Sequence, residues 1–191
     1  DGRLLKAELP QRFKNNENAY EFMQKCKDST FSIGSLEQKP AKKSPTAPFT
    51  TSTLQQEASR KLGFSVNQTM MVAQKLYEAG KITYMRTDSV NLSQDALAAA
   101  ELEITNLYGE EFVQRRSYTK KAKGAQEAHE AIRPSYMNNK SVDGDSSHKR
   151  LYDLIWKRTI SSQMADAQFD RTTVKIDISN ASEQFVAKGE V

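Results

Sequence analysis

Apolar and polar residues alternate near both ends of the chain, which is the pattern of half-buried β-strands. Near the N-terminus the alternation covers residues 5–9 and 31–33, and near the C-terminus it covers residues 173–178. The chain then ends in the run FVAKGEV, which looks like a further strand. The sequence therefore predicts β-structure built from both ends of the chain.

The residues between these strands repeat their apolar positions at helical spacing. Four apolar residues from Ala19 to Cys26 fall at i, i+3, i+4 and i+7, which predicts a helix from Asn18 with Cys26 in the core. Four further helices are expected, over about residues 53–63, 65–80, 93–109 and 147–165.

Capping residues mark the ends of these predicted helices. Thr53 with Gln56 resembles a capping box, and Ser65 with Gln68 repeats it. Glycines suit the helix stops, and the candidates are Gly63, Gly80 and Gly109. The third of the four helices is expected to bury Leu97, Ala100, Ile104, Leu107 and Tyr108. The fourth is expected to bury Leu151, Leu154, Ile155 and Ile160.

Strands at both ends with helices between them predict a mixed α and β fold. We expect a mainly helical domain over residues 44–168, inserted into a β-containing domain formed by residues 1–43 and 169–191. The chain starts without Met and stops inside a strand-like run. It is therefore expected to be a piece of a larger protein.

Composition and charge limit the classes of protein to which this chain can belong. Of 191 residues, 28 are Lys or Arg and 24 are Asp or Glu, a net charge of 28 − 24 = +4. No stretch approaches the roughly 18 to 20 apolar residues of a membrane helix, so we expect a soluble chain. Two basic runs, Lys39–Pro48 and Arg115–Gly124, are expected to be solvated loops that could touch phosphates, although such runs are more often plain surface loops without a ligand.

Candidate chemistry lies in the run Lys81–Ser89. If this run is extended, Tyr84, Arg86 and Asp88 project from one side, because side chains alternate along an extended chain. A tyrosine can act as a covalent nucleophile, and an arginine can hold a phosphate by two parallel hydrogen bonds. Asp88 can orient Arg86 or a nearby donor. An edge strand with an ordinary surface ion pair is the alternative interpretation.

A second candidate segment, QEAHEAIRPS at Gln126–Ser135, contains His129 and Arg133. A lone histidine is more often a structural hydrogen-bonding residue, but as a functional residue His129 can contact a phosphate or move a proton near neutral pH. Arg133 is similarly ambiguous. No carboxylate cluster has convincing metal-ligand spacing, so no metal site is expected in this chain.

Two long motifs resemble those of one family. The run APFTTSTLQQEASRKLGFSVNQTMMVAQKLYEAGKITYMRTDSVNLS, residues 47–93, is similar to the active-site region of bacterial type IA DNA topoisomerases, and EAHEAIRPS resembles their second signature. In that family a helical tyrosine-bearing domain is inserted into an arch-shaped β domain. The resemblance implies that Tyr84 attacks a phosphodiester, stays joined to the 5′-phosphate and allows strand passage that relaxes negative supercoils.

The resemblance also implies roles for other residues. Arg86 would contact the scissile phosphate and His129 would assist near it. The predicted DNA-binding or nucleotide-binding residues are Gln74, Glu78, Thr87, Asp88 and Arg133.

The family's complete enzymes carry a toprim domain whose acidic cluster binds Mg²⁺, and no such cluster is found in this sequence. We therefore expect Mg²⁺ only in the full-length enzyme, none bound by this chain, and no cleavage or relaxation of DNA by the chain alone. The expected partners are a single-stranded DNA segment and the toprim and C-terminal domains of the same polypeptide, with no membrane. The expected location is the bacterial cytoplasm, in association with the nucleoid.

Other classes of protein are alternative interpretations of Tyr84, His129 and Arg133. In tyrosine recombinases two residues normally separate the His from the Arg, and both precede the Tyr. Here three residues separate His129 from Arg133, and both follow Tyr84. That order argues against a recombinase. A non-catalytic module that binds single-stranded nucleic acid, with Tyr84 stacked on a base, stays open, as does a core fragment without ligand affinity.

Overall fold

The computed structural model describes residues 4–118 and 129–191, and the chain divides into two compact units. Unit 1 comprises Asp1–Lys43 and Ala167–Val191, and unit 2 comprises Ser44–Asp166. The second boundary lies two residues before the predicted residue 168. The combination of helices with a three-stranded sheet confirms the mixed α and β class.

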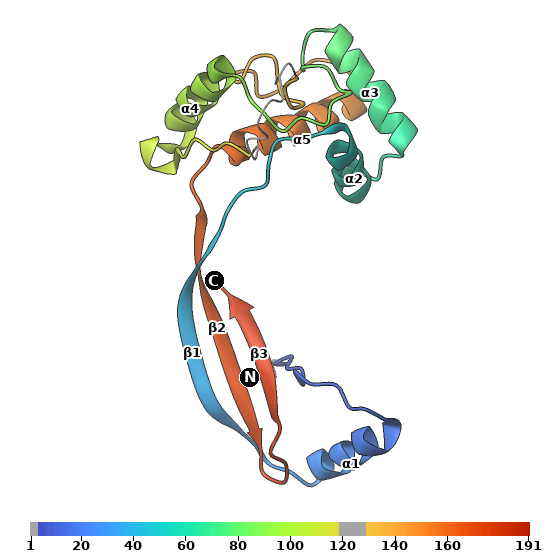
Figure 1. The fold of residues 1–191 in the computed structure, drawn as a ribbon, viewed down its shortest axis with the longest axis vertical. Coiled ribbons are helices and arrows are strands. Elements are labelled where there is room, and N and C mark those ends of the chain that lie inside the picture. Colours follow the sequence, from blue (N-terminus) through green and yellow to red (C-terminus); the bar gives the residue numbers. More distant parts are fainter. Residues whose placement is uncertain (1–3, 119–128) are drawn as a thin grey trace, which may run out of the picture. The chain divides into compact units, whose positions relative to one another are not determined.

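Unit 1 is built on an antiparallel sheet in the order β1-β2-β3 (Figure 1). Its strands are β1 (Phe31–Lys43), β2 (Ala167–Ile178) and β3 (Gln184–Glu190). Strand β1 runs through Pro40, so the prediction of a loop from Lys39 onward is wrong for the first five residues. An edge strand tolerates proline because one side of its backbone has no partner strand.

The helix of unit 1, α1 (Asn16–Lys27), begins after the capping residue Asn15. It places Phe22 against Phe185 of β3, with ring centroids 5.9 Å apart. Cys26 is only half-buried, so the prediction that it lies in the core is wrong. The predicted strand over residues 5–9 is also wrong, because in that segment only Glu8 forms a bridge, with Val186.

Unit 2 is helical, and its helices begin and end close to their predicted positions. They are α2 (Thr51–Leu62), α3 (Val66–Glu78), α4 (Gln94–Tyr108) and α5 (Ser146–Ser162), with a short 3₁₀ turn η1 at Glu110–Phe112. Ser65 caps α3 as predicted, and Gly63 ends α2 with φ of 71°. The capping box of α2, however, is formed by Thr50 and Thr53, three residues before the predicted pair.

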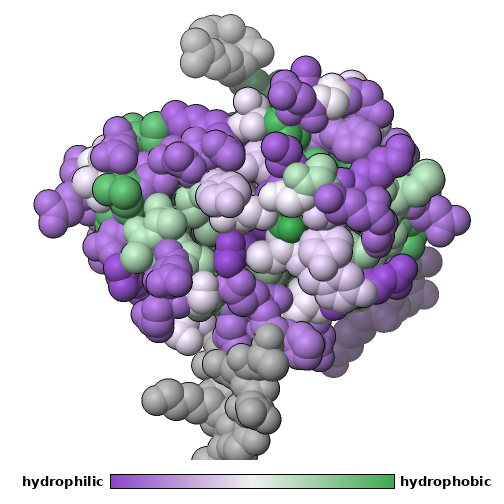
Figure 2. Space-filling view, turned by 90° about the horizontal axis from the view of Figure 1, so that it is seen from above, coloured by the Kyte–Doolittle hydropathy of each residue, from purple (hydrophilic) through white to green (hydrophobic). Residues whose placement is uncertain are grey.

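The core of unit 2 is organised around α5, which contacts α2, α3 and α4 and runs between α4 and the α2–α3 pair (Figure 1). All four residues predicted to be buried on α5 are buried. On α4, Ala100 and Ile104 are buried as predicted, but Tyr108 is 47% exposed. The surface drawn in Figure 2 is mainly hydrophilic, with apolar residues in small separate groups. Within the described residues, every helix is too short or too polar to cross a membrane.

The buried face of α4 can be tested with two substitutions on the same helix. Ile104→Ala should lower the free energy of unfolding of unit 2 by about 2–5 kcal/mol, because it leaves a cavity in the core. Leu102→Ala is the matched control: its side chain is 63% exposed, and we expect a change within about 0.5 kcal/mol. Urea denaturation followed by the fluorescence of Trp156, the chain's single tryptophan, reports on unit 2. Equal losses of unfolding free energy in the two variants would contradict the assignment of Ile104 to the buried face of α4 and of Leu102 to its exposed face.

Candidate active site

Backbone hydrogen bonds join the two segments singled out in the sequence. The N–H of Thr83 donates to the carbonyl of Arg133 at 2.9 Å, and the N–H of Ser135 donates to the carbonyl of Lys81 at 2.9 Å. The hydroxyl of Thr83 adds a bond to the carbonyl of Ala131 at 2.7 Å. The two segments are thereby held side by side, which brings the His129 segment against the Tyr84 segment.

The run Lys81–Ser89 does not form a regular strand, and only Ile82 makes a bridge, with Pro134. The predicted alternation of its side chains is nevertheless present. Tyr84, Arg86 and Asp88 are exposed, whereas the intervening residues are buried or half-buried. An irregular segment therefore presents these three side chains to solvent.

Thr51, the first residue of α2, ties this segment to the helix. Its hydroxyl donates towards the carbonyls of Met85 at 2.8 Å and Thr87 at 3.1 Å. The same hydroxyl oxygen accepts the N–H of Thr87 at 2.9 Å, and the N–H of Thr51 donates to the carbonyl of Thr87 at 2.9 Å. The N-terminus of α2 is thus held directly against the residues around Arg86.

A hollow of about 400 Å³ lies at this junction. It is lined by Thr51, Ser52, Arg86, Thr87, Asp88 and His129. A helix N-terminus favours an anion, and a guanidinium and hydroxyl groups add donors to it. The hollow therefore has the composition of a phosphate site, with one carboxylate at its edge.

Arg86 and Asp88 have no hydrogen bond or ion pair with any residue in the described part of the chain. The ordinary surface ion pair between them, which the alternative interpretation requires, is therefore not formed. Both charged groups remain available to a ligand. The predicted orientation of Arg86 by Asp88 is absent as well.

Tyr84 is 48% exposed, and its ring packs edge-on against Tyr77 of α3 with centroids 5.2 Å apart. It is not among the residues that line the hollow, but it lies two residues from Arg86 on the same segment. The contact with Tyr77 restricts the ring while leaving the phenol accessible.

Three of the predicted ligand-binding residues lie outside this hollow. Gln74 and Glu78 are one turn apart on α3, and the Gln74 side chain donates to the Glu78 carboxylate at 2.6 Å. Arg133 has a side chain only 15% exposed, and it is held by Glu130 at 2.7 Å and by the carbonyl of Pro134. Arg133 is thus engaged within the protein rather than presented to a ligand.

Three residues of this region were not predicted from the sequence: Thr51, Ser52 and Glu130. The first two were hidden because the predicted start of α2 lay too far along the chain. Glu130 accepts the N–H of Ser93 at 2.7 Å, and so links the His129 segment to the start of α4. A glutamate beside a histidine gave no signal of that contact.

The basic run Arg115–Gly124 is only partly described, since residues 119–124 lie outside the described ranges. Arg115 pairs with Glu101, and Arg116 pairs with Asp166 at 2.5 Å. These two arginines therefore serve structural contacts. In residues 4–118 and 129–191, no group of three His, Cys, Asp or Glu residues is arranged to hold a metal ion.

Replacing Thr51 tests the junction between α2 and the Tyr84 segment. Thr51→Val should lower the free energy of unfolding of unit 2 by about 1–3 kcal/mol, because it leaves the N–H of Thr87 and a carbonyl without their partner. Thr51→Ser retains the hydroxyl and should cost less. Denaturation followed by Trp156 fluorescence measures both, and equal losses would show that the hydroxyl does not hold the junction.

Glu130 gives a test that depends on pH. Burial alone would raise the pKa of Glu130, but hydrogen bonds from Arg133 and Ser93 hold it below the usual 4.5. A lowered pKa in the folded state contributes stability above the unfolded pKa, and this stability is lost as the pH falls through the folded value. Glu130→Gln should therefore be less stable than the parent chain at pH 7, by about 1–3 kcal/mol. The difference should shrink below about pH 4.5, and a difference independent of pH would contradict the interaction.

Comparison with known proteins agrees with the two motifs. The sequence profile of the family described as "DNA topoisomerase" matches residues 3–191. The curated protein "DNA topoisomerase 1" of Streptomyces coelicolor is 52% identical over 164 residues, which cover 83% of this chain and 17% of that protein. Its namesake from Zymomonas mobilis is 54% identical over 149 residues, which cover 76% of this chain and 12% of that protein.

A solved structure agrees with the fold. The structure of full-length topoisomerase I from Thermotoga maritima matches with a TM-score of 0.76 at 35% identity, and the match covers 97% of this chain and 32% of that chain. The chain spans less than a fifth of the length of the two curated relatives. Because the family profile covers nearly all of its residues, the chain belongs to the family of bacterial type IA DNA topoisomerases.

Proposed function

We propose that this chain carries the nucleophile of a type IA DNA topoisomerase, which cleaves one DNA strand transiently and relaxes negative supercoils by strand passage. One observation carries the proposal: an exposed tyrosine lies two residues from an arginine that has no partner among the described residues, and this arginine lines a hollow of phosphate-binding composition. Members of the family are isomerases that act on DNA topology. Tyr84 is proposed as the catalytic residue that bonds to DNA.

In the proposed reaction, the phenol oxygen of Tyr84 attacks the phosphorus of a backbone phosphodiester. The new bond joins that oxygen to the 5′-phosphate, and the bond from phosphorus to the 3′-oxygen breaks. The phenol loses its proton, and the departing 3′-oxygen takes one up to become a free hydroxyl. One phosphodiester is exchanged for another, so the 3′-hydroxyl can reverse the step and reseal the strand.

Arg86 is proposed to hold the non-bridging oxygens of the attacked phosphate, since it is exposed and has no ion pair within residues 4–118 and 129–191. His129, from the second signature, is proposed to assist on the same group, and the start of α2 adds hydroxyl donors. Thr87 and Asp88 line the same hollow and are proposed to contact an adjoining nucleotide. Gln74 and Glu78 are proposed to contact it from α3, whereas the engagement of Arg133 by Glu130 favours a structural role.

Mg²⁺ is proposed to be held by the toprim domain of the full-length enzyme. The described residues contain no group that fits a metal ion, so no step is assigned to a metal in this chain. The 191-residue chain alone is accordingly proposed not to relax DNA, and its proposed partners are single-stranded DNA and the toprim and C-terminal domains. A cytoplasmic, nucleoid-associated location follows from DNA as the substrate.

A non-catalytic single-stranded nucleic-acid-binding module remains a second candidate. The observation that favours it is the pair of exposed aromatic rings, with Tyr77 40% exposed beside Tyr84. Bases stack on such rings with little sequence preference. This candidate differs from the first in requiring no covalent bond.

The covalent step can be tested by supplying the acidic half of the site separately. The chain is mixed with a toprim-containing portion of the same family, Mg²⁺ and single-stranded DNA labelled at its 3′ end. Cleavage should leave the label on the protein, because the attached fragment keeps its 5′-phosphate on Tyr84. DNA labelled at its 5′ end should instead release a free fragment ending in a 3′-hydroxyl.

Tyr84→Phe should abolish the denaturation-resistant adduct, and Arg86→Ala should reduce it strongly. Tyr136→Phe is the matched control, since Tyr136 is 66% exposed in the same unit, and it should leave the adduct unchanged. An assembled mixture without any adduct, combined with unaltered DNA affinity in Tyr84→Phe, would favour the binding module. Plasmid relaxation by the chain alone would refute its proposed dependence on the toprim domain.

A further inference from the structure

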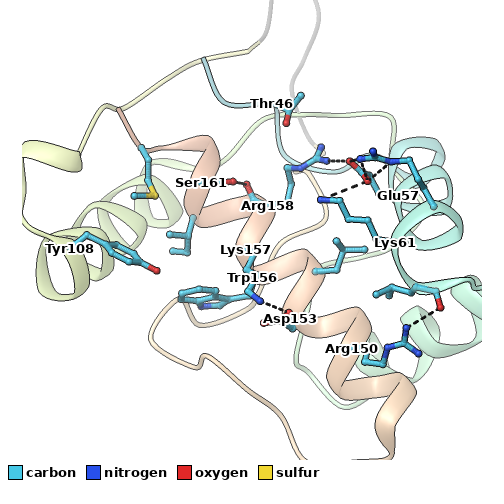
Figure 3. A pocket seen from close by; sticks show the side chains of 15 residues that line it. Thr46, Glu57, Lys61, Tyr108, Arg150, Asp153, Trp156, Lys157, Arg158 and Ser161 are labelled. Carbon is cyan, nitrogen blue, oxygen red and sulfur yellow. Dashed lines mark hydrogen bonds and ion pairs between the residues drawn. The ribbon is translucent and has the colours of Figure 1, made fainter. Parts of the chain in front are cut away.

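A second and larger hollow of about 650 Å³ lies in unit 2, over the C-terminal half of α2 and along α5 (Figure 3). Residues from Glu57 to Leu62 of α2 form one side of it, and residues from Arg150 to Ser161 of α5 form its floor. None of its lining residues lines the hollow beside Tyr84. The two hollows are therefore separate features, and α2 contributes lining residues to both.

The charges around this hollow are strongly unequal. Arg60 and Lys61 come from α2, and α5 contributes Arg150, Lys157 and Arg158, against only two acidic residues, Glu57 and Asp153. The balance is 5 − 2 = +3, whereas the whole chain carries +4. Most of the chain's net positive charge is thus gathered at one surface.

Not all of these cations are available to a ligand. Arg158 is 13% exposed, pairs with Glu57 at 2.8 Å and lies 4.2 Å from the centre of the Phe49 ring. It neutralises Glu57 and serves the core. Arg60 at 70% and Lys61 at 52% side-chain exposure remain on the rim, although both also approach Glu57.

Lys157 of α5 lines the hollow. Its side chain is 68% exposed, and the ion pair that it makes with Asp153 joins two exposed groups on one helix. Such a pair is weak, typically about 0.3–0.5 kcal/mol, and a stronger anion can displace it. Arg150 donates one hydrogen bond to the carbonyl of Leu62 and retains further donors.

An aromatic ring lies at the opposite end of the hollow from Arg150. Tyr108 is 47% exposed, and its hydroxyl points into the hollow (Figure 3). Exposed cations combined with an accessible aromatic ring are the elements with which proteins bind single-stranded nucleic acids, because phosphates pair with the cations while a base stacks on the ring. A duplex would offer phosphates but no free base.

We propose that this hollow binds a single-stranded nucleic-acid segment other than the one held at Tyr84, with phosphates on Lys61 and Lys157 and a base against Tyr108. The site requires no covalent chemistry. A strand bound here would be held by the same helix, α2, whose first residues border the Tyr84 site.

The test measures binding of a fluorescent oligothymidylate to the 191-residue chain by anisotropy over a series of salt concentrations. The variant Lys61→Gln with Lys157→Gln should reduce the slope of log affinity against log salt by about 1.4, since each single-strand phosphate contact contributes about 0.7. The matched control is Lys140→Gln with Lys149→Gln, which removes two exposed lysines of unit 2 outside the hollow. It should leave the slope nearly unchanged.

Two further comparisons identify the occupant. Tyr108→Ala should weaken oligothymidylate binding by about 5- to 100-fold, the loss of one base stack, whereas Tyr108→Phe should bind normally. Neither change should affect binding of a duplex of the same length. Equal salt slopes for the two lysine pairs would overturn the site, and an unchanged affinity in Tyr108→Ala would overturn its single-strand assignment.

Binding of oligothymidylate to this hollow is independent of the covalent reaction at Tyr84. The Tyr84→Phe variant should show the same slope of log affinity against log salt as the parent chain, but it should form no covalent adduct. A chain that forms the adduct but shows equal slopes would refute this site alone. Conversely, unequal slopes without any adduct would leave the site intact and remove the proposed nucleophile.

Discussion

Backbone hydrogen bonds from an irregular segment hold the candidate active site together. Residues 81–87 have no regular strand pairing, yet their polar backbone groups must find partners where they are buried. Thr83 pairs with the His129 segment, and Thr51 pairs with Met85 and Thr87. Because backbone groups and the inward-facing hydroxyls of Thr51 and Thr83 make these bonds, the side chains that face solvent are left free. A site built in this way can be rigid and still present an unpaired arginine.

Burial divides the arginines of unit 2 into two groups. Arg116, Arg133 and Arg158 have side chains between 13% and 17% exposed, and each is paired with a carboxylate. A buried charge requires such a partner, because removal from water is costly. Other arginines are exposed, but exposure alone does not leave them free: Arg60 pairs with Glu57 and Arg115 pairs with Glu101. Arg86 is exposed and has no ion pair with any described residue, so a ligand phosphate can reach it. The sequence reveals neither the exposure of a guanidinium nor its pairing.

Sequence patterns predicted the helices of unit 2 well, because periodicity, a capping serine and a terminal glycine agree at α3 and α4. The start of α2 was misplaced because four consecutive hydroxyl residues, 50–53, can each serve as the cap. The strand through Pro40 was not predicted, because within a sheet proline is tolerated mainly in an edge strand. Whether a strand lies at the edge depends on the tertiary fold, which the local sequence does not show. The motifs identified Tyr84 and its segment, but the partnership of Glu130 with Arg133 depends on folding and could not be derived.

The positive charge on α2 and the positive charge on α5 have different physical origins. Basic residues in the last turn of α2 are favoured by the helix dipole, which needs no ligand to explain it. Arg150, in the N-terminal part of α5, gains nothing from that dipole, but its bond to the carbonyl of Leu62 caps the end of α2. Arg158 is accounted for by Glu57. Lys157 has neither a dipole nor a buried partner, and its pair with Asp153 joins two exposed groups, so it is the cation of this surface that an external anion can most readily engage.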